Sequence, residues 1–140
     1  MKYAALLPML ALAFGLAACS AIQPNDLAGR WQVQQIADTA LGDGVDIWIE
    51  VNGDTATGFT GCSDFNASVT TFETNVSFSP PAKQPGECTS AAAATDEARF
   101  LGVLPSVRRY VRHGRSLELL SATPGEEALI RLRLTDETSG

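Results

Sequence analysis

Three cysteines and a single histidine carry the most distinctive chemistry in this sequence. Cys19 ends the run Leu-Ala-Ala-Cys, whose small residues suit a narrow peptidase cleft, so its thiol is a candidate for diacylglyceryl transfer. Cys62 and Cys88 lie 26 residues apart. In an oxidising compartment such a pair is most simply a disulfide, with two buried free thiols or a redox or metal role as alternatives. His113 has no second histidine, CxxC or HExxH motif beside it, so no metal site is predicted.

Acid–base chemistry has one weak candidate in the sequence. If the disulfide forms, Asp64 and Glu87 come near one another, and paired carboxylates can move protons. The simpler interpretation makes Ser63 and Asp64 turn-capping residues and Glu87 a solvated loop charge. His113 falls in a turn, and no nucleophile is suitably spaced from it. We therefore predict no catalytic residue, no enzyme activity and no cofactor.

The first 18 residues have the pattern of a lipoprotein signal peptide. Lys2 supplies a positive start, and an apolar run interrupted by Pro8 and Gly15 follows. This run is too short and broken for a transmembrane helix, which needs about 20 apolar residues. We expect residues 1–18 to be removed and acyl chains such as palmitate to be attached to Cys19. An ordinary secretory signal cut near residue 18 is the alternative.

The anchor predicts the location of the protein. Residues 19–26, which include Pro24 and Asn25, resemble a short tether between lipid and fold. Ser20 follows the acylated cysteine, and by analogy with lipoprotein sorting it predicts the outer membrane, with the domain facing the periplasm. The membrane is thus an expected partner of this cell-envelope lipoprotein.

Charge and length limit the ligands that the protein can bind and the number of domains that it can form. The chain of 140 residues carries a net charge of −6 and has a pI near 4.6, which argues against nucleic-acid binding. Residues 27–135 make one domain, and residues 136–140 make a tail. From residue 19 to 88 there are nine acids and two bases, whereas from 89 to 140 there are seven of each. An anion-binding surface must therefore come from the second half.

Short strands surround one helix in the predicted order of elements. Strands are expected over residues 27–36, 45–51, 55–60, 67–72, 76–79, 107–113, 116–121 and 128–134. Asn52-Gly53 predicts a tight hairpin, and residues 38–44 are turn-like. Residues 80–86 contain three prolines and are expected to be a loop outside the ladder. Trp31 and Trp48 are interpreted as packing residues, with a ligand platform as the alternative.

The helix is expected to begin at a Thr89 or Ser90 cap and to stop by Leu104, before Pro105. Its apolar face follows helical spacing, so it should lie on the sheet. The residues of this face are Ala93, Glu97, Phe100, Leu101 and Leu104.

An arginine-rich stretch follows the helix and is the candidate anion-binding surface, carried by Arg108, Arg112 and Arg115. It is expected to lie next to the strand of Arg131 and Arg133. Val107 is apolar and differs in strand parity from Tyr110, so a bulge is expected near Arg108 or Arg109 if both side chains face the core. The simpler interpretation is pairing of these arginines with nearby glutamates at the surface.

Several short motifs occur in a fixed order along the chain. They are an opening Leu-x-Gly-x-Trp, a Gly-Cys with phenylalanine three residues on, a second cysteine, and apolar positions in the helix and closing strands. The residues are Leu27, Gly29, Trp31, Gly61, Cys62, Phe65, Cys88, Glu97, Phe100, Leu104, Val107, Tyr110, Leu117 and Leu119. In this order they resemble the META domain family, which includes heat-inducible HslJ-type lipoproteins of bacterial envelopes.

Some positions depart from the family pattern. Ser63 stands where asparagine is usual after the first cysteine, and the usual Thr-x-Met-x approach to Cys88 is replaced. Ala67 and Val69 take the places of a glycine and an aromatic residue. These differences all concern the turn around Cys62 and its surroundings.

The resemblance implies an α+β fold, with a strongly curved, barrel-like antiparallel sheet of about eight strands and one helix packed on it. It implies no enzymatic activity. We expect a monomeric, non-catalytic envelope lipoprotein that acts in stress response or maintenance through contact with an envelope protein or the cell wall. The alternative is an inhibitor of an exported protease or lysozyme. Such inhibitors include small β-barrel lipoproteins with a similar opening, but the helix argues against it.

Overall fold

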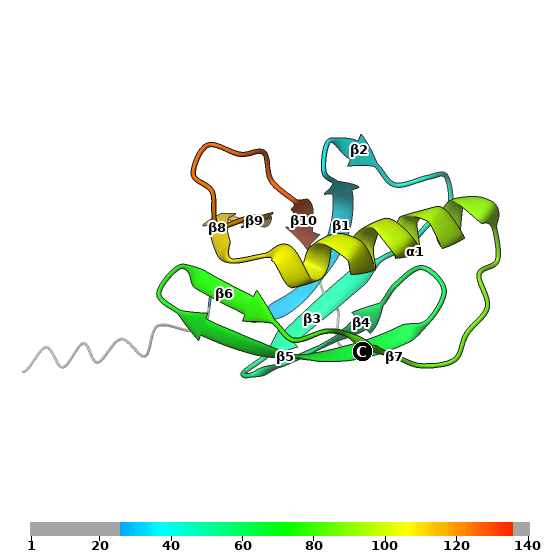
Figure 1. The fold of residues 1–140 in the computed structure, drawn as a ribbon, viewed down its shortest axis with the longest axis horizontal. Coiled ribbons are helices and arrows are strands. Elements are labelled where there is room, and N and C mark those ends of the chain that lie inside the picture. The colour runs from blue at the N-terminus through cyan, green and yellow to red at the C-terminus, as the bar shows by residue number, and fades with distance from the viewer. Residues whose placement is uncertain (1–25, 136–140) are drawn as a thin grey trace, which may run out of the picture.

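Eight antiparallel strands close into a barrel in the computed structural model, which describes residues 26–135 (Figure 1). The barrel strands are β1 (Gly29–Ile36), β3 (Trp48–Asn52), β4 (Thr55–Phe59), β5 (Asp64–Phe72), β6 (Asn75–Phe78), β8 (Arg109–His113), β9 (Ser116–Leu120) and β10 (Ile130–Leu134). They are adjacent in this order, and β10 pairs with β1 to complete the ring. The predicted curved sheet of about eight strands with one helix is confirmed.

Alternating inward side chains fill the barrel, as expected for half-buried strands. In β10, Ile130 and Leu132 are buried while Arg131 and Arg133 face outward. Trp31 is fully buried, and its indole N–H donates to the carbonyl of Leu27 at 2.8 Å. The barrel interior is therefore a packed apolar core.

Two short strands lie where the sequence indicated turn and loop. β2 (Thr39–Ala40) pairs with the end of β1, and β7 (Ala82–Lys83) pairs with the start of β5. The prediction that residues 80–86 stay outside the ladder is wrong. A proline removes only its own donor, and the amide of Gln84 still donates to the carbonyl of Asp64 at 2.8 Å.

β5 begins at Asp64, three residues before the expected start, so Asp64 opens a strand instead of capping a turn. The reason lies in the partner strand, where Gly58 stands opposite Phe65. A Cβ at Gly58 would lie 2.7 Å from the Phe65 ring and 2.1 Å from the Trp48 carbonyl oxygen. A glycine here lets the strands pair closely from Asp64 onward.

The helix α1 (Ala91–Val103) begins where predicted, because the Ser90 hydroxyl accepts the amide of Ala93 at 3.0 Å. It covers the end of the barrel at which β1 and β4 finish (Figure 1). Phe100 is fully buried and meets Phe65 edge to face, with ring centroids 5.5 Å apart. In the described part of the chain no helix is long and apolar enough to cross a membrane.

A short 3₁₀ turn, η1 (Leu104–Ser106), follows the helix and leads into β8. Val107 is buried before β8 begins, three residues ahead of the buried Tyr110. Leu120 of β9 is paired with Arg109, and its carbonyl also accepts the amide of Arg108 at 2.8 Å. Two consecutive residues therefore face one, as in the bulge predicted near Arg108 or Arg109. A second irregularity lies in β1, between Val33 and Gln35, opposite β10.

The seam between β6 and β8 is the thinnest in the barrel. A single residue pair, Asn75 with Arg109, is aligned across the two strands. Two further backbone bonds support the seam, from the amide of Val76 to the Arg108 carbonyl and from the amide of Tyr110 to the Thr74 carbonyl, each 3.0 Å. Beyond this point β6 and β8 diverge, and η1 fills part of the space between them.

Candidate binding surfaces and the polar centre beneath the helix

A buried carboxylate links the helix to the barrel wall. Glu97 of α1 is 8% exposed, and one of its oxygens accepts the Lys83 ammonium at 3.0 Å. Its other oxygen is bonded to the hydroxyl of Thr60, which follows β4 and is fully buried. Burial of a carboxylate is costly unless it is paired, and both of its oxygens have partners here.

Thr60 also organises the turn that carries the first disulfide cysteine. Its hydroxyl oxygen accepts the amides of Ser63 at 3.0 Å and Cys62 at 3.3 Å, and its own amide donates to the Ser63 carbonyl at 2.9 Å. Thr60 therefore holds the turn and the helix with one side chain. Nothing in the sequence pattern indicated this role.

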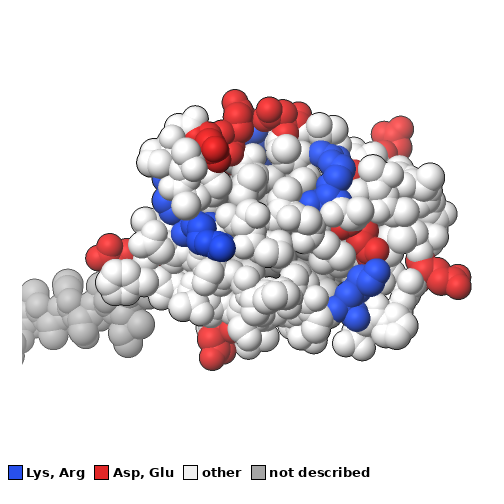
Figure 2. All heavy atoms as spheres, in the orientation of Figure 1, with Lys and Arg blue, Asp and Glu red and all other residues white. Residues whose placement is uncertain are grey.

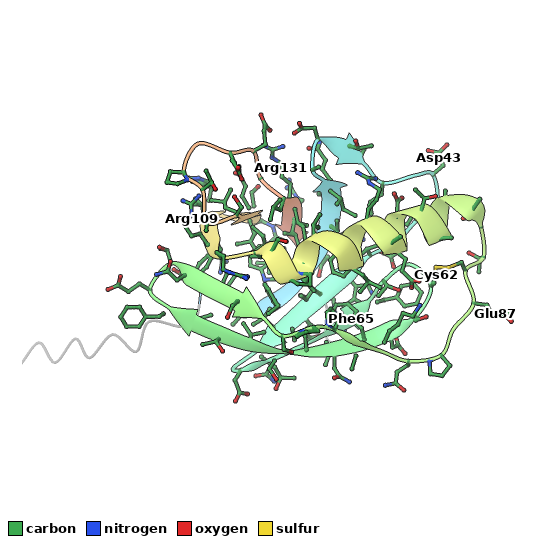
Figure 3. The ribbon with its side chains drawn as sticks, viewed as in Figure 1. Asp43, Cys62, Phe65, Glu87, Arg109 and Arg131 are labelled. Atoms are coloured by element: carbon green, nitrogen blue, oxygen red, sulfur yellow. A yellow bond between two sulfur atoms is a disulfide. The ribbon has the colours of Figure 1, made fainter. Side chains whose placement is uncertain are left out.

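The structure joins Cys62 to Cys88 in a disulfide with Cα atoms 4.4 Å apart. Cys62 is buried beside α1, whereas Cys88 lies in the exposed loop before the helix (Figure 3). The loop passes so closely that a Cβ at Gly86 would lie 2.5 Å from the Cys62 carbonyl oxygen and the Ser63 hydroxyl oxygen. The bond thus fastens the proline-rich loop against the turn that Thr60 organises.

Cys62, Cys88 and Glu97 offer ligand atoms within 4.8 Å of one another. The two sulfurs are bonded to each other, and the Glu97 oxygens are bonded to Lys83 and Thr60. A cation would have to displace all of these partners. This donor set does not fit a metal site in the oxidised protein, and it serves as a structural connection.

A second buried carboxylate joins α1 to β1. Asp96 accepts the backbone amide of Gly42 at 2.8 Å and the Arg99 guanidinium at 2.9 Å. Arg99 also donates to the carbonyl of Ile36, the last residue of β1. The helix is therefore positioned by two neighbouring acids, of which the sequence pattern placed only Glu97 on the buried face.

The weak catalytic candidates lie apart from this buried centre. Asp64 and Glu87 are both exposed, and Glu87 points into solvent in Figure 3. His113 is exposed at the turn between β8 and β9. The exposure of Glu87 and His113 agrees with the simpler interpretation of a solvated loop charge and a turn residue, whereas Asp64 opens β5 and does not cap a turn.

The three arginines of the predicted anion surface each donate to backbone carbonyl groups of their own chain. Arg108 donates to the Pro105 and Val107 carbonyls at 2.7 Å, and Arg115 donates to that of Leu134 at 2.9 Å. Arg112 donates to the carbonyls of Gly114 and Asp26, both at 2.9 Å. These guanidinium groups therefore fasten the barrel ends as well as carrying charge.

The arginine-rich stretch was predicted to lie next to the strand of Arg131 and Arg133. This prediction is wrong for the part of the stretch that forms β8. β9 lies between β8 and β10, and it is the turn residue Arg115 that reaches β10 through Leu134. On the face drawn in Figure 2, the Lys and Arg side chains form separate small groups. They do not make one continuous basic patch there.

A polar hollow of about 280 Å³ lies on the outer surface of β1, β9 and β10, where β1 is irregular. It is lined by Gln34, Gln35, Ser116, Leu117, Glu118, Arg131, Leu132 and Arg133. Arg131 donates to the Gln35 side-chain oxygen at 3.3 Å and lies 3.6 Å from Glu127 and 3.9 Å from Asp38. These are long, exposed contacts that a ligand could replace at little cost. The alternation of Arg131 and Arg133 was visible in the sequence, but the bulge was not.

The two tryptophans have different roles. Trp31 belongs to the core, whereas Trp48 faces outward from β3 and is half-buried. The Arg30 guanidinium lies 4.0 Å from the Trp48 ring centroid and bonds to Glu50 at 2.9 Å. Trp48 is therefore packed beneath an arginine, in agreement with the packing interpretation.

The end of the barrel opposite α1 is closed by Arg112. Its guanidinium lies 5.1 Å from the Trp31 ring centroid and bonds to the carbonyl of Asp26, where the described chain begins. Tyr110 is buried beside this contact. Burial raises its pKa above the ordinary value of 10.0, and the Asp26 carboxylate raises the pKa further.

A closed antiparallel barrel with one helix over its end, fastened by a buried ion pair and a disulfide, defines the class of fold. The META domain matches residues 25–135, and the chain belongs to the META domain family. A search of curated proteins gave no match.

Two solved structures share the fold. One is described as "NMR structure of the protein from Burkholderia xenovorans"; it is 17% identical, has a TM-score of 0.62, and the match covers 79% of this chain and 84% of that one. The other is described as "NMR structure of the protein"; it is 12% identical, has a TM-score of 0.59, and the match covers 77% and 90%. At these identities the likeness concerns the fold alone.

Proposed function

We propose that this protein is a non-catalytic lipoprotein of the bacterial envelope, anchored to the outer membrane through Cys19. It takes part in envelope stress response or maintenance by contacting another envelope component. The observation that carries the proposal is the polar hollow on β1, β9 and β10. Cys19 itself lies outside the described residues, and the proposal for it depends on the sequence pattern.

We propose a non-catalytic role because the buried carboxyl groups of the domain bond to other groups of the same domain. The buried carboxylates Asp96 and Glu97 hold the helix in place and have basic or hydroxyl partners. The barrel interior is filled with apolar side chains. A reaction needs convergent polar groups that face a substrate, whereas these groups face one another.

The hollow indicates the chemistry of the partner. Arg131 and Arg133 present planar donor groups, and the amides of Gln34 and Gln35 can both donate and accept. Guanidinium groups bind carboxylate or phosphate oxygens in pairs. A protein or cell-wall component with exposed carboxylates fits this surface best.

Photo-crosslinking in living cells tests the contact. A photoreactive amino acid at Gln34, which is exposed beside the hollow, should give a discrete adduct. Thr57 is exposed on β4, away from the hollow, and is the matched control. Arg131→Glu combined with Arg133→Glu should abolish the Gln34 adduct while leaving the circular dichroism spectrum unchanged. Equal adducts from both positions, or none from Gln34, would contradict the proposal.

Inhibition of an exported protease or lysozyme is the second candidate. The exposed loop between β9 and β10, with Pro124 and Gly125 at its tip, is the observation that favours it, since a projecting loop can enter an enzyme cleft. Mixing the protein with panels of metalloproteases, serine proteases and lysozymes tests it. Tight inhibition that is lost when this loop is shortened would reverse the order of the two proposals.

A further inference from the structure

The hairpin between β5 and β6 carries an unusually exposed aromatic residue. Phe72, the last residue of β5, is 71% exposed. Val111 of β8, which is 37% exposed, follows Tyr110, whose amide donates to the carbonyl of Thr74 in the same hairpin turn. Single exposed apolar residues are common, but two of them here flank one hairpin tip.

A hollow of about 320 Å³ adjoins the Phe72 ring, along the outer side of the seam between β6 and β8. It is lined by Thr70, Phe72, Asn75, Val76, Ser77, Arg108 and Ala122. The apolar surface is thus wider than the single ring.

The described chain begins beside the same hairpin. The carbonyl of Asp26 accepts a hydrogen bond from Arg112 of β8 at 2.9 Å. The hydroxyl of Tyr110, in the same strand, donates to the carbonyl of Glu73 at 3.1 Å. Asp26 and the hairpin tip are therefore held together at the end of the barrel opposite α1.

The distance to the expected anchor is short. Seven residue steps separate Cys19 from Asp26, and a fully extended chain of that length reaches at most about 25 Å. Acyl chains on Cys19 would keep this end of the barrel close to the bilayer surface. Phe72 would then face lipid, while α1 and the disulfide would lie at the far end.

We infer that the barrel end formed by the β5–β6 hairpin docks on the bilayer that holds the Cys19 acyl chains, with Phe72 inserted among the lipid headgroups. This inference rests on the proposed lipid anchor. The same end carries Asp26 and Glu73 as well as Arg112, and the exposed Phe72 ring supplies the apolar part of the contact. One ring binds a membrane weakly by itself, but the anchor raises its local concentration at the surface.

Quenching by brominated lipid tests the inference on the full, membrane-processed chain. The protein is reconstituted in phosphatidylcholine vesicles whose acyl chains carry bromine, which quenches tryptophan at short range. Phe72→Trp places a reporter at the hairpin, and Asp43→Trp places one at an exposed site beside the opposite end of the molecule (Figure 3). The emission of the parent, from Trp31 and Trp48, is subtracted. Intact-mass measurement of the same samples reports acylation of Cys19, and circular dichroism reports folding.

The expected result is an acylated protein in which brominated vesicles quench the fluorescence of the tryptophan introduced at position 72. The fluorescence of the tryptophan introduced at position 43 should be unchanged. An acylated, folded protein with equal emission at both positions would overturn the docking and leave the anchor intact. A protein without the acyl mass would overturn the anchor and the docking with it. The two failures are therefore distinguishable.

Discussion

The Arg112 guanidinium lies over the ring of Trp31, 5.1 Å from its centroid, and closes the barrel end opposite the helix. Trp31 is fully buried, so the arginine stem and head complete the cover of the core. A residue whose charge suggested anion binding therefore has a structural role in this fold.

Arg112→Gln should lower the free energy of unfolding by about 1 kcal/mol, because it removes the cation–π contact of an exposed arginine with Trp31 and the bond to Asp26. Urea denaturation measures the loss, and near-ultraviolet circular dichroism should show a change in the tryptophan bands. Arg108→Gln is the matched control, since Arg108 bonds to carbonyls near it in sequence. If both variants behave alike, the contact with Trp31 contributes nothing measurable.

The disulfide should stabilise the domain by about 3.5 kcal/mol, from the loop entropy of a 26-residue separation. Cys62→Ala combined with Cys88→Ala should lose about this amount in urea denaturation. A thiol reagent should add no mass to an unreduced Cys19→Ser variant, and two adducts after denaturation and reduction. Two adducts on the unreduced, native protein would show that the sulfurs are not joined.

The Thr60 hydroxyl contacts the Glu97 carboxylate and the turn that carries Cys62. Thr60→Val keeps the shape of the side chain but leaves buried polar groups without a partner, which should cost about 1–3 kcal/mol. Thr60→Ser retains the hydroxyl and should cost clearly less. Both are compared by thermal unfolding under non-reducing conditions. A Val variant as stable as the Ser variant would show that the hydroxyl is dispensable.

Tyr110 should make stability sensitive to alkaline pH. Its pKa is raised in the folded protein, so above the ordinary value of 10.0 the unfolded chain loses this proton before the folded one does. The tyrosine therefore contributes stability below pH 10 that is lost as pH rises through the folded pKa. Urea denaturation at a series of pH values should show a steeper decline for the parent than for Tyr110→Phe. Parallel declines would contradict the raised pKa.

Two glycines should respond in opposite directions to alanine. Gly58→Ala places a Cβ against the Trp48 carbonyl and the Phe65 ring and should cost about 3 kcal/mol. Gly102→Ala, in α1, meets nothing within 4 Å and should gain about 0.5–1 kcal/mol. Thermal melting distinguishes them. A well-tolerated Gly58→Ala would mean that β4 and β5 can separate there.

Much of the fold could be predicted from local patterns. The Asn52-Gly53 hairpin, the Ser90 cap and the alternation of Ile130 to Arg133 follow from neighbours in sequence, which is why they agree with the structure. The early start of β5 and the two-residue β7 depend on residues that meet only in three dimensions, such as Gly58 with Phe65. Local propensity contains no information about them.

The candidate site was harder to predict for the same reason. The arginines at 108, 112 and 115 were visible as a charged run, but the carbonyl groups of Asp26 and Leu134, which accept from Arg112 and Arg115, come from distant positions in the sequence. The hollow beside Arg131 depends on a register shift between β1 and β10, which no single strand reveals. Charge is visible in a sequence, whereas the partners of a charge are set by the topology.

The pairing of β1 with β10 brings Trp31 opposite Leu134, from the two extremes of the domain. Contacts between such distant positions are slow to form, because a long loop must close before they contribute stability. The pairing of β1 with β10 can therefore form only after the last strand has been synthesised. A truncated or stalled chain would expose β1 and β9 as open edges that other strands can join, so correct folding of this barrel is linked to completion of the polypeptide.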